Sequence, residues 1–375
     1  MHNEEGQKQY YRLKNWSILI HFAITLLFLF IMAYSFSLPL KDAINVITRN
    51  SVIVVTIYLF LFFILYFIFT FGLKFYEGFV AERKFKSAVE PFGKWIKELA
   101  KKEGIIYCKF LVIVQIAYFF LETDQKFWWL WAWIAWMILS NLFTKIYPMF
   151  IQPLLYRYSL LDDSDLKQKL VSLAAKVNIK VKDIYKISSD WAIKKKEVAL
   201  SWTGSERKVI LSDTLSDYAK EEIEVITARE LVHIHYGHLW QLLAVESVTA
   251  LVGFCFVGVL VEPLIKIFGF KLIFDIAAFP VLAALFLIAI MIVVPIQNYF
   301  SRRLQRQTDE FVLKLTGSPE AFISVLMRQN LDQAKDPNPR RFIEVLLYEQ
   351  PALSRRILMA QDYAHNLGFK KHPKF

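Results

Sequence analysis

The sequence has little cysteine and lacks several patterns that carry enzyme chemistry. Its 375 residues include only two cysteines, Cys108 and Cys255, and both lie in apolar stretches. Two isolated cysteines provide neither a disulfide framework nor the spacing of a zinc site, so we expect buried thiols that pack as small hydrophobic groups. The sequence also has no glycine-rich phosphate loop, and no Ser/His/Asp arrangement suggests itself. These absences argue against a disulfide-stapled domain, a nucleotide-binding loop and a serine hydrolase.

Apolar residues, in contrast, are in excess and gather in long blocks. Hydrophobic residues make up 56% of the chain, whereas an average soluble chain has about 45–50%. A helix that crosses a bilayer needs about 17–25 residues, and six blocks reach this length: 16–37, 52–71, 105–121, 127–147, 242–266 and 272–297. The first block lacks a small-residue cleavage site, so we expect a retained span and not a signal peptide. We predict a mainly α, polytopic membrane protein with about six transmembrane helices.

The distribution of lysine and arginine predicts how these spans are oriented. With the N-terminus inside, the inner segments 1–15, 72–104, 151–241 and 298–375 hold 3, 8, 14 and 13 of these residues, and each outer loop holds one or two. Segments rich in Lys and Arg stay on the cytoplasmic side, so we expect both termini and the polar segments to be cytoplasmic. Topology and anionic membrane lipid then explain the net charge of +11. No basic groove with interleaved aromatic residues indicates nucleic acid as a partner.

The polar segments between the spans predict the domain organisation. Residues 1–154 are expected to form an N-terminal transmembrane region of four spans, with a cytoplasmic helical loop over residues 72–104. Residues 155–241 and 298–375 flank a transmembrane hairpin at residues 242–297. Because both flanking segments are polar and lie on the same side of the membrane, we expect them to pack into one cytoplasmic domain.

This polar domain is expected to combine helices with short strands. Leucines at helical spacing predict a helix with one apolar face, formed by Leu166, Leu170, Leu173 and Val177. Stretches rich in β-branched and aromatic residues predict strands over residues 181–188, 197–204 and 207–213. Residues 218–240 predict a single helix that continues into the fifth span.

The helix over residues 218–240 carries an incomplete zinc motif. A helix with His, Glu and His at positions i, i+1 and i+4 holds zinc between two imidazoles, with the Glu as general base. A third ligand, usually a carboxylate, completes such a site and leaves one position open for water. In this sequence Arg229 occupies the first imidazole position, Glu230 the general-base position and His233 the second imidazole position. Arginine has no acceptor atom for a metal, and Glu-x-x-His alone is a weak motif.

Several further segments strengthen the motif, because they occur in a fixed order along the chain. They are Tyr76–Phe85, Ile210–Leu215, Glu221–His238, Asn298–Arg303, and Tyr348 with Pro351–Ile357. Together they resemble the type I CAAX prenyl endopeptidases, which are integral-membrane zinc metalloproteases that cleave prenylated proteins. The resemblance extends from about residue 55 to 360. It implies a cytoplasmic, gluzincin-like α+β metalloprotease domain and a large chamber enclosed by the membrane helices.

The resemblance also shows where this chain departs from the family, and the departures fall on functional positions. Gln305 stands in place of the zinc-binding glutamate of a Glu-x-x-x-Asp pair, of which Asp309 remains. Gln350 stands in place of the histidine that a Ser-His-Pro-Pro motif supplies to the oxyanion. Ala199 and Leu200 align with an Asn-Ala pair on the edge strand that aligns the substrate.

These substitutions predict a pseudoprotease that has lost its zinc site and needs no cofactor. We expect a binding or scaffolding role that uses the intramembrane chamber. Expected partners are membrane lipid and a hydrophobic or lipidated peptide or a membrane protein. Two alternatives stay open. One is an active zinc metalloendopeptidase that cleaves peptide or lipidated protein substrates at the membrane, and the other is metal-independent handling of lipid or peptide through Glu230 and His233.

The sequence leads to one structural hypothesis about Arg229. Because an unpaired buried carboxylate is costly, we expect Arg229 to replace the zinc in a buried network with Glu230, Asp309 or both. In the alternative arrangement, Arg229 points to solvent.

A small group of histidines lies next to the motif. His235 and His238 follow His233 on the same predicted helix, and we expect a solvated helix face near the membrane in preference to a metal site.

Overall fold

The computed structural model describes residues 4–85, 91–146, 158–187, 198–203, 206–212, 215–333 and 336–371. The chain folds into two compact units, each built from two segments. The first unit combines Met1–Trp136 with Val248–Val294, and the second combines Met137–Ser247 with Pro295–Phe375. The domain boundaries expected from the sequence stay a prediction.

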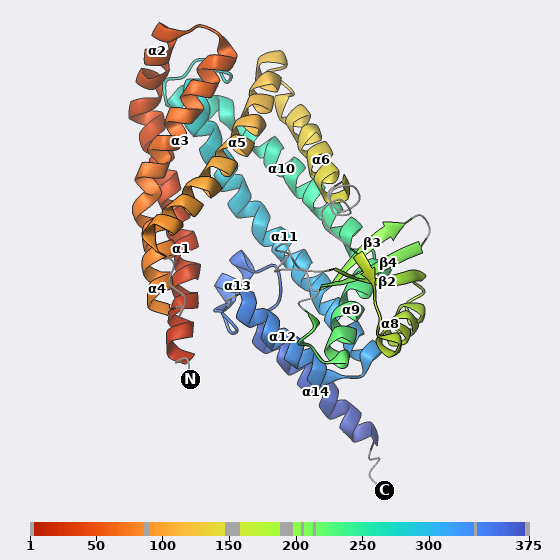
Figure 1. The fold of residues 1–375 in the computed structure, drawn as a ribbon. Coiled ribbons are helices and arrows are strands. Elements are labelled where there is room, and N and C mark those ends of the chain that lie inside the picture. The colour runs from red at the N-terminus through yellow and green to blue at the C-terminus, as the bar shows by residue number, and fades with distance from the viewer. Residues whose placement is uncertain are drawn as a thin grey trace. The chain divides into compact units, whose positions relative to one another are not determined.

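Long apolar helices make up the first unit (Figure 1). Its elements are α1 (Glu4–Ile31), η1 (Met32–Phe36), α2 (Ser37–Ile47), α3 (Ser51–Phe75), η2 (Tyr76–Ala81), α4 (Glu82–Phe85), α5 (Phe92–Thr123) and η5 (Ile276–Ala278). Three helices have residues in both units: α6 (Trp128–Ile146), α10 (His238–Ile267) and α11 (Phe279–Thr316).

Helices of membrane-spanning length occur in five places within the described residues. They are Gln9–Ile47, Ser51–Lys84, Phe92–Thr123, His238–Ile267 and Ile276–Thr316. A shorter apolar helix, Trp128–Ser140, lies where the sequence predicts the fourth span. The predicted mainly α, polytopic architecture is therefore confirmed.

Polar side chains in the first unit are paired at one end of the bundle. The Lys41 ammonium lies 2.6 Å from a carboxylate oxygen of Asp275. The buried Ser37 hydroxyl donates to the carbonyl oxygen of Ala277 at 2.5 Å and lies 2.6 Å from the Tyr58 hydroxyl. These contacts join α2, α3 and η5, and they satisfy polar groups that would otherwise be costly to bury.

A close approach between α6 and α10 depends on Gly258. A Cβ atom built on Gly258 would lie 2.5 Å from Cδ1 and 2.6 Å from Cγ of Trp129. Carbon atoms in favourable contact lie about 3.5–4.0 Å apart. The indole therefore occupies the space that any larger side chain at Gly258 would need.

We predict that Gly258→Ala destabilises the protein, because the new methyl group forces α6 and α10 apart. Overpacking of this kind costs about 1–3 kcal/mol. Thermal unfolding of the detergent-solubilised protein should show a lower Tm.

Gly253→Ala on the same helix is the matched control. A Cβ there would lie 3.7 Å from Val293 and 3.9 Å from Ala289, which are ordinary contacts. Alanine also favours a helix by about 1 kcal/mol over glycine, so the Tm should stay unchanged or rise. Equal Tm values for the two variants would contradict the close packing described for Trp129.

The second unit contains a four-stranded sheet in the order β1-β2-β4-β3. Its strands are β1 (Tyr158–Leu160), β2 (Val181–Ile187), β3 (Val198–Thr203) and β4 (Glu206–Ser212). The pairs β1–β2 and β3–β4 are antiparallel, and β2–β4 is parallel. Ala199 lies opposite Ile210 and Leu200 opposite Val209. Among the described residues, β3 is thus an outer strand, and the role of Ala199 and Leu200 in aligning a substrate stays a prediction.

Helices α8 (Ser164–Lys176) and α9 (Lys220–His235) pack on this sheet. With α12 (Pro319–Gln333), α14 (Leu353–Lys371) and the second half of α11, they enclose one hydrophobic core. The short helix α13 (Arg341–Leu347) also belongs to the second unit. The predicted apolar face of α8 is buried, since Leu166, Leu170 and Leu173 are at most 5% exposed. Leucine periodicity therefore identified both α8 and the side that faces the core.

Candidate functional site

Helix α9 carries the residues of the incomplete zinc motif. Ala228, Leu231 and Val232 are fully buried in the core of the second unit. These three side chains fix the rotation of the helix, so that Arg229, Glu230 and His233 come to half-buried positions beside the core. At its first turn the Glu222 carboxylate accepts a hydrogen bond from the backbone N–H of Ala219 at 2.9 Å.

The chain turns sharply at the end of α9, where the sequence predicts an uninterrupted helix. Gly237 has φ +63°, a backbone conformation that glycine adopts without the steric cost of a Cβ atom. Helix α9 therefore ends at His235 and α10 begins at His238. The prediction of one continuous helix over residues 218–240 was wrong, because apolar periodicity continued across a glycine that ends the helix.

This turn brings two imidazole rings together. Nδ1 of His233 lies 2.9 Å from Nδ1 of His238, and His238 is only 1% exposed. The expectation of a solvated histidine face was therefore wrong for His238. His235 is exposed, and its Nδ1 lies 3.1 Å from the carbonyl oxygen of Val177.

The buried surroundings keep His233 uncharged at neutral pH. Burial, with smaller contributions from the neighbouring His238 and the positive charge of Arg229, lowers the pKa of His233 to about 4, against the opposing effect of the Asp309 carboxylate. A neutral imidazole has one donor and one acceptor nitrogen. One Nδ1–H can thus donate to the other Nδ1 across the pair of rings.

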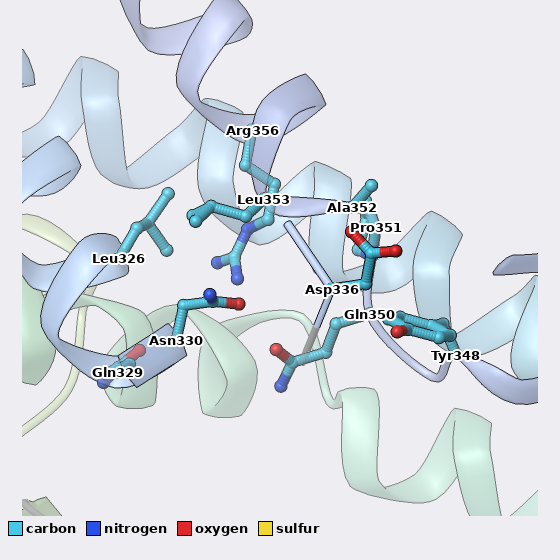
Figure 2. A pocket seen from close by; sticks show the side chains of 10 residues that line it. All are labelled: Leu326, Gln329, Asn330, Asp336, Tyr348, Gln350, Pro351, Ala352, Leu353 and Arg356. Carbon is cyan, nitrogen blue, oxygen red and sulfur yellow. The ribbon is translucent and has the colours of Figure 1, made fainter. Parts of the chain in front are cut away.

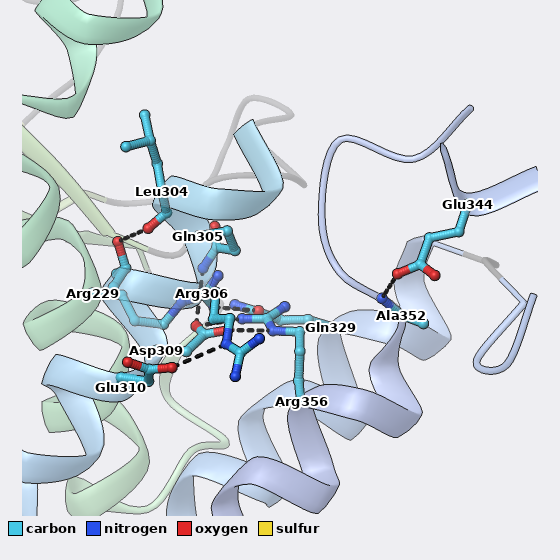
Figure 3. Close-up of polar contacts among 11 residues, drawn as sticks. Arg229, Leu304, Gln305, Arg306, Asp309, Glu310, Gln329, Glu344, Ala352 and Arg356 are labelled. Carbon is cyan, nitrogen blue, oxygen red and sulfur yellow. Dashed lines mark hydrogen bonds and ion pairs between the residues drawn. The ribbon is translucent and has the colours of Figure 1, made fainter. Parts of the chain in front are cut away.

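Asp309 on α11 is the most enclosed charge of the site (Figure 3). Nε of Arg356 donates to its Oδ2 at 2.7 Å, and a terminal nitrogen of Arg356 donates to its Oδ1 at 2.8 Å. Side-chain exposure is 0% for Asp309 and 6% for Arg356. The amide nitrogen of Gln305 donates to Oδ1 of Asp309 at 3.0 Å. Three hydrogen bonds therefore compensate this buried carboxylate.

The arginine that pairs with Asp309 is therefore Arg356 of α14. The sequence-based hypothesis paired Arg229 with Glu230, Asp309 or both. Its Asp309 part is wrong, and a pairing with Glu230 stays a prediction. The hydrogen bond described for Arg229 runs to the side-chain oxygen of Gln329 on α12, at 2.6 Å. Arg229 thus contacts a neutral amide, and its alternative placement in open solvent does not hold, because the side chain is half-buried.

The loop that carries Gln350 is fixed by groups on both sides. Arg302 donates to the carbonyl oxygens of Glu344 at 2.9 Å and Tyr348 at 2.6 Å. The buried carboxylate of Glu344 accepts a hydrogen bond from the backbone N–H of Ala352 at 3.0 Å. Because both ends of the loop are held, Gln350 keeps a defined position.

Gln350 lines an open cleft beside these groups (Figure 2). The cleft has a volume of about 400 Å³, including the space open to solvent. Its walls are formed by Leu326, Gln329, Asn330, Asp336, Tyr348, Gln350, Pro351, Ala352, Leu353 and Arg356. The cleft is therefore lined by Gln329, which contacts Arg229, by Arg356, which pairs with Asp309, and by Gln350 at the substituted oxyanion position.

Comparison with known proteins agrees with this arrangement. A family model described as "CAAX prenyl protease N-terminal, five membrane helices" matches residues 3–157. A second model, "Peptidase family M48", matches residues 160–364, more than half of the chain. The chain belongs to peptidase family M48. This confirms the resemblance to the CAAX prenyl endopeptidases, and it makes the chain a multi-pass membrane protein of the zinc metalloprotease family M48.

Three relatives share between 19% and 24% of their aligned residues with this chain. The uncharacterized metalloprotease YhfN of Bacillus subtilis is 23% identical, over 76% of this chain and 68% of its own. The CAAX prenyl protease 1 homolog of Arabidopsis thaliana is 24% identical, over 75% and 67%. The crystal structure of S. mikatae Ste24p has a TM-score of 0.64 at 19% identity and covers 84% of this chain and 77% of that one. The last likeness shows a shared fold.

By resemblance to the family, three positions correspond to zinc ligands: Arg229, His233 and Gln305. The groups at two of them, a guanidinium and an amide, are not usual zinc ligands. Arg229 presents a guanidinium, which has no lone pair for a metal. The amide nitrogen of Gln305 faces Asp309, and Nδ1 of His233 faces His238. Within the described part of the chain, no group of three or more His, Cys, Asp or Glu side chains could hold a metal ion.

Two residues of the site were not identified from the sequence, Gln329 and Arg356, and His238 was expected to be solvated. Arg356 lies in the C-terminal motif and could have been proposed as a partner for Asp309, since both are retained charges. Gln329 lies 100 residues from Arg229, and no pattern in the sequence joins the two. Burial of His238 follows from the turn at Gly237.

We predict that Arg356→Leu destabilises the protein, because it leaves the Asp309 carboxylate buried without its cation. Removing one partner of a buried ion pair typically costs about 3–5 kcal/mol. The double variant Arg356→Leu/Asp309→Leu should lose less stability than the single variant, because it removes both charges of the pair. Thermal and denaturant unfolding in detergent measure both effects.

Arg306→Leu is the matched control for this experiment. Arg306 is 73% exposed and pairs with Glu310 one helical turn away on α11, a type of pair worth about 0.3–0.5 kcal/mol. An Arg356→Leu variant as stable as Arg306→Leu would show that the Asp309 pair does not hold the fold together.

Proposed function

We propose that this M48 protein is a pseudoprotease that retains its fold to bind a hydrophobic or lipid-modified peptide or a membrane protein. The proposal rests on the hydrogen bonds that two substituted side chains, Gln305 and Arg229, make within the protein. Gln305 is hydrogen-bonded to Asp309 at 3.0 Å and Arg229 to Gln329 at 2.6 Å. Both side chains are therefore engaged in contacts within the protein at positions where the family binds zinc.

Ligand chemistry supports the loss of the zinc site. Catalytic zinc sites need three protein ligands, drawn from His, Cys and carboxylates. Of the three positions only His233 retains such a ligand, because Arg229 is a cation and Gln305 a neutral amide. A fixed positive charge beside the site also repels a second cation. Glu230 then has no metal-bound water to deprotonate.

Strand β3 supports a peptide as the ligand. An outer strand can accept an extended peptide through main-chain hydrogen bonds, and β3 pairs with β4 along one side. Side chains at Ala199 and Leu200 are apolar and small to medium in size, which suits a hydrophobic segment. Peptide binding at this edge needs neither a metal nor a catalytic base.

The charge distribution supports a cytoplasmic position for the peptide-binding unit. Segments 151–241 and 298–375 hold 27 of the 45 lysines and arginines in the chain. Such segments tend to remain on the cytoplasmic side of a membrane. In this proposal both termini face the cytoplasm as well, and the bilayer lipid is a further partner.

We predict that purified wild-type protein contains no stoichiometric zinc and cleaves no prenylated peptide. The variant Arg229→His/Gln305→Glu restores two imidazoles and a carboxylate, and it should take up zinc. Adding Gln350→His returns the oxyanion group, whose absence typically costs about 10²–10³-fold in rate. Elemental analysis and a peptide-cleavage assay with and without chelator measure these outcomes.

Glu230→Gln provides the control, because it should abolish cleavage in the restored triple variant and change nothing in the wild type. One zinc per wild-type chain, with chelator-sensitive cleavage, would overturn the proposal in favour of an active metalloendopeptidase. Wild-type activity that survives chelation and depends on His233 would overturn it in favour of a metal-independent reaction.

We also predict that a photo-crosslinking residue at Leu200 captures an added farnesylated peptide. The control position is Ser159 on β1, the outer strand on the opposite side of the sheet. Labelling at Leu200 should exceed labelling at Ser159, and unlabelled peptide should compete for it. Equal labelling at both positions would argue against β3 as the peptide-binding edge.

A further inference from the structure

Helix α5 is longer than the membrane it crosses. Its 32 residues span about 48 Å at 1.5 Å per residue, whereas the hydrocarbon core of a bilayer is about 30 Å thick. The apolar part of α5 begins at Ile105 and runs to Leu121. Its first thirteen residues, 92–104, therefore extend beyond the hydrocarbon to the level of the lipid headgroups.

The protruding part of α5 has two distinct faces. One face is half-buried and includes Trp95, Leu99 and Glu103. Exposed lysines form the other face: Lys94, Lys97, Lys101 and Lys102. The helix therefore presents a row of cations away from the protein.

Contacts between α3 and α5 hold this part of the helix in place. Nζ of Lys74, at the end of α3, lies 2.8 Å from the Glu103 carboxylate, and both side chains are at most 15% exposed. The rings of Phe75 and Phe79 lie 5.7 and 5.4 Å from the ring of Trp95. Tryptophan is enriched at the membrane–water interface, and Trp95 lies next to Lys94 in the sequence, at the same level of the helix.

Helix α4 adds two cations at the same end of the α3–α5 pair (Figure 1). Arg83 and Lys84 are exposed, and the Arg83 guanidinium lies 3.9 Å from the centre of the Phe79 ring. We define the basic patch as Arg83, Lys84, Lys94, Lys97, Lys101 and Lys102. Two carboxylates, Glu82 and Glu98, lie among these six cations, so the patch has a net charge of +4.

The opposite end of α5 has a different charge. Glu122, Asp124 and Lys126 lie there, and Arg49 precedes the start of α3 beside them, so these four residues carry no net charge. A surface without net positive charge does not attract anionic lipid. The two ends of this helix pair are therefore suited to different lipid environments.

We propose that the basic patch binds the phosphate headgroups of anionic phospholipids in the bilayer that the protein spans. Clusters of about four to eight Lys and Arg residues beside a membrane span attract such lipids. Lys94, Lys97 and Lys101 follow one another at intervals of three and four residues, so they lie on one side of α5, and Lys102 is next to Lys101. The Lys74–Glu103 pair and the aromatic cluster hold that side toward the headgroups.

Native mass spectrometry of the full-length protein in mixed micelles tests the proposal. The probes are phosphatidylglycerol, which is anionic, and phosphatidylcholine, which is zwitterionic. The variant Lys97→Gln/Lys101→Gln/Lys102→Gln should bind phosphatidylglycerol at least about tenfold more weakly, since each lysine near the surface contributes several-fold. Binding of phosphatidylcholine should not change.

Two matched variants complete the experiment. Lys169→Gln/Lys176→Gln/Lys314→Gln removes the same charge from exposed positions of the second unit and should bind phosphatidylglycerol like the wild type. Replacing Lys97, Lys101 and Lys102 with arginine keeps the charge and should preserve binding. Equal losses in the two glutamine variants would overturn the proposal, as would wild-type protein that binds both lipids equally. Inorganic phosphate that displaces the lipid completely would also overturn it, because a soluble anion would then be the ligand.

Discussion

The buried ion pair between Asp309 and Arg356 is the interaction on which the second unit depends. It joins α11 to α14 across 47 residues of sequence, and both side chains are almost completely enclosed. A carboxylate in such a place needs a cation and further donors, and Gln305 supplies one of these donors from the preceding turn of α11. The neighbouring cleft, the loop with Gln350 and the contact of Arg229 with Gln329 are arranged around this pair.

The same pair relates the fold to its chemistry. In the zinc enzymes that this chain resembles, the position of Gln305 belongs to a negatively charged metal ligand, and the position of Arg229 to a neutral imidazole. Here the positive charge is on the protein itself, and the amide donates a hydrogen bond to the remaining carboxylate. In the proposed pseudoprotease the site thus keeps its charge balance without a metal, so stability no longer depends on a bound ion.

Much of the fold could be predicted from local patterns. The apolar blocks predicted the long helices. The leucine spacing predicted both α8 and its buried face, because the side chains that repeat at helical spacing are the ones buried in the core. The strands β2, β3 and β4 followed from β-branched residues. Gly237 was missed because a single glycine in an apolar pattern does not by itself mark an end, and its positive φ is set by the tertiary structure.

The site could be predicted in its residue types but not in its pairings. Family resemblance located Arg229, Gln305 and Gln350, whereas the partners Gln329 and Arg356 come from α12 and α14, far along the chain. Arg229 and Arg356 are equivalent candidates for Asp309 when only charge is considered. Which arginine reaches the carboxylate depends on how α9, α11 and α14 pack together, and the periodicity of the sequence does not predict that packing.

The hydrogen bond between Gln305 and Asp309 also bears on how such a protein evolves. A single change of Gln305 to Glu would place two carboxylates about 3 Å apart in a buried site, where like charges raise each other's energy. A change of Arg229 to His alone would supply one ligand without the others. Neither substitution alone therefore completes a zinc ligand set, and Gln305→Glu alone is expected to lower stability. In the proposed pseudoprotease, zinc binding at these positions would therefore require several substitutions at once.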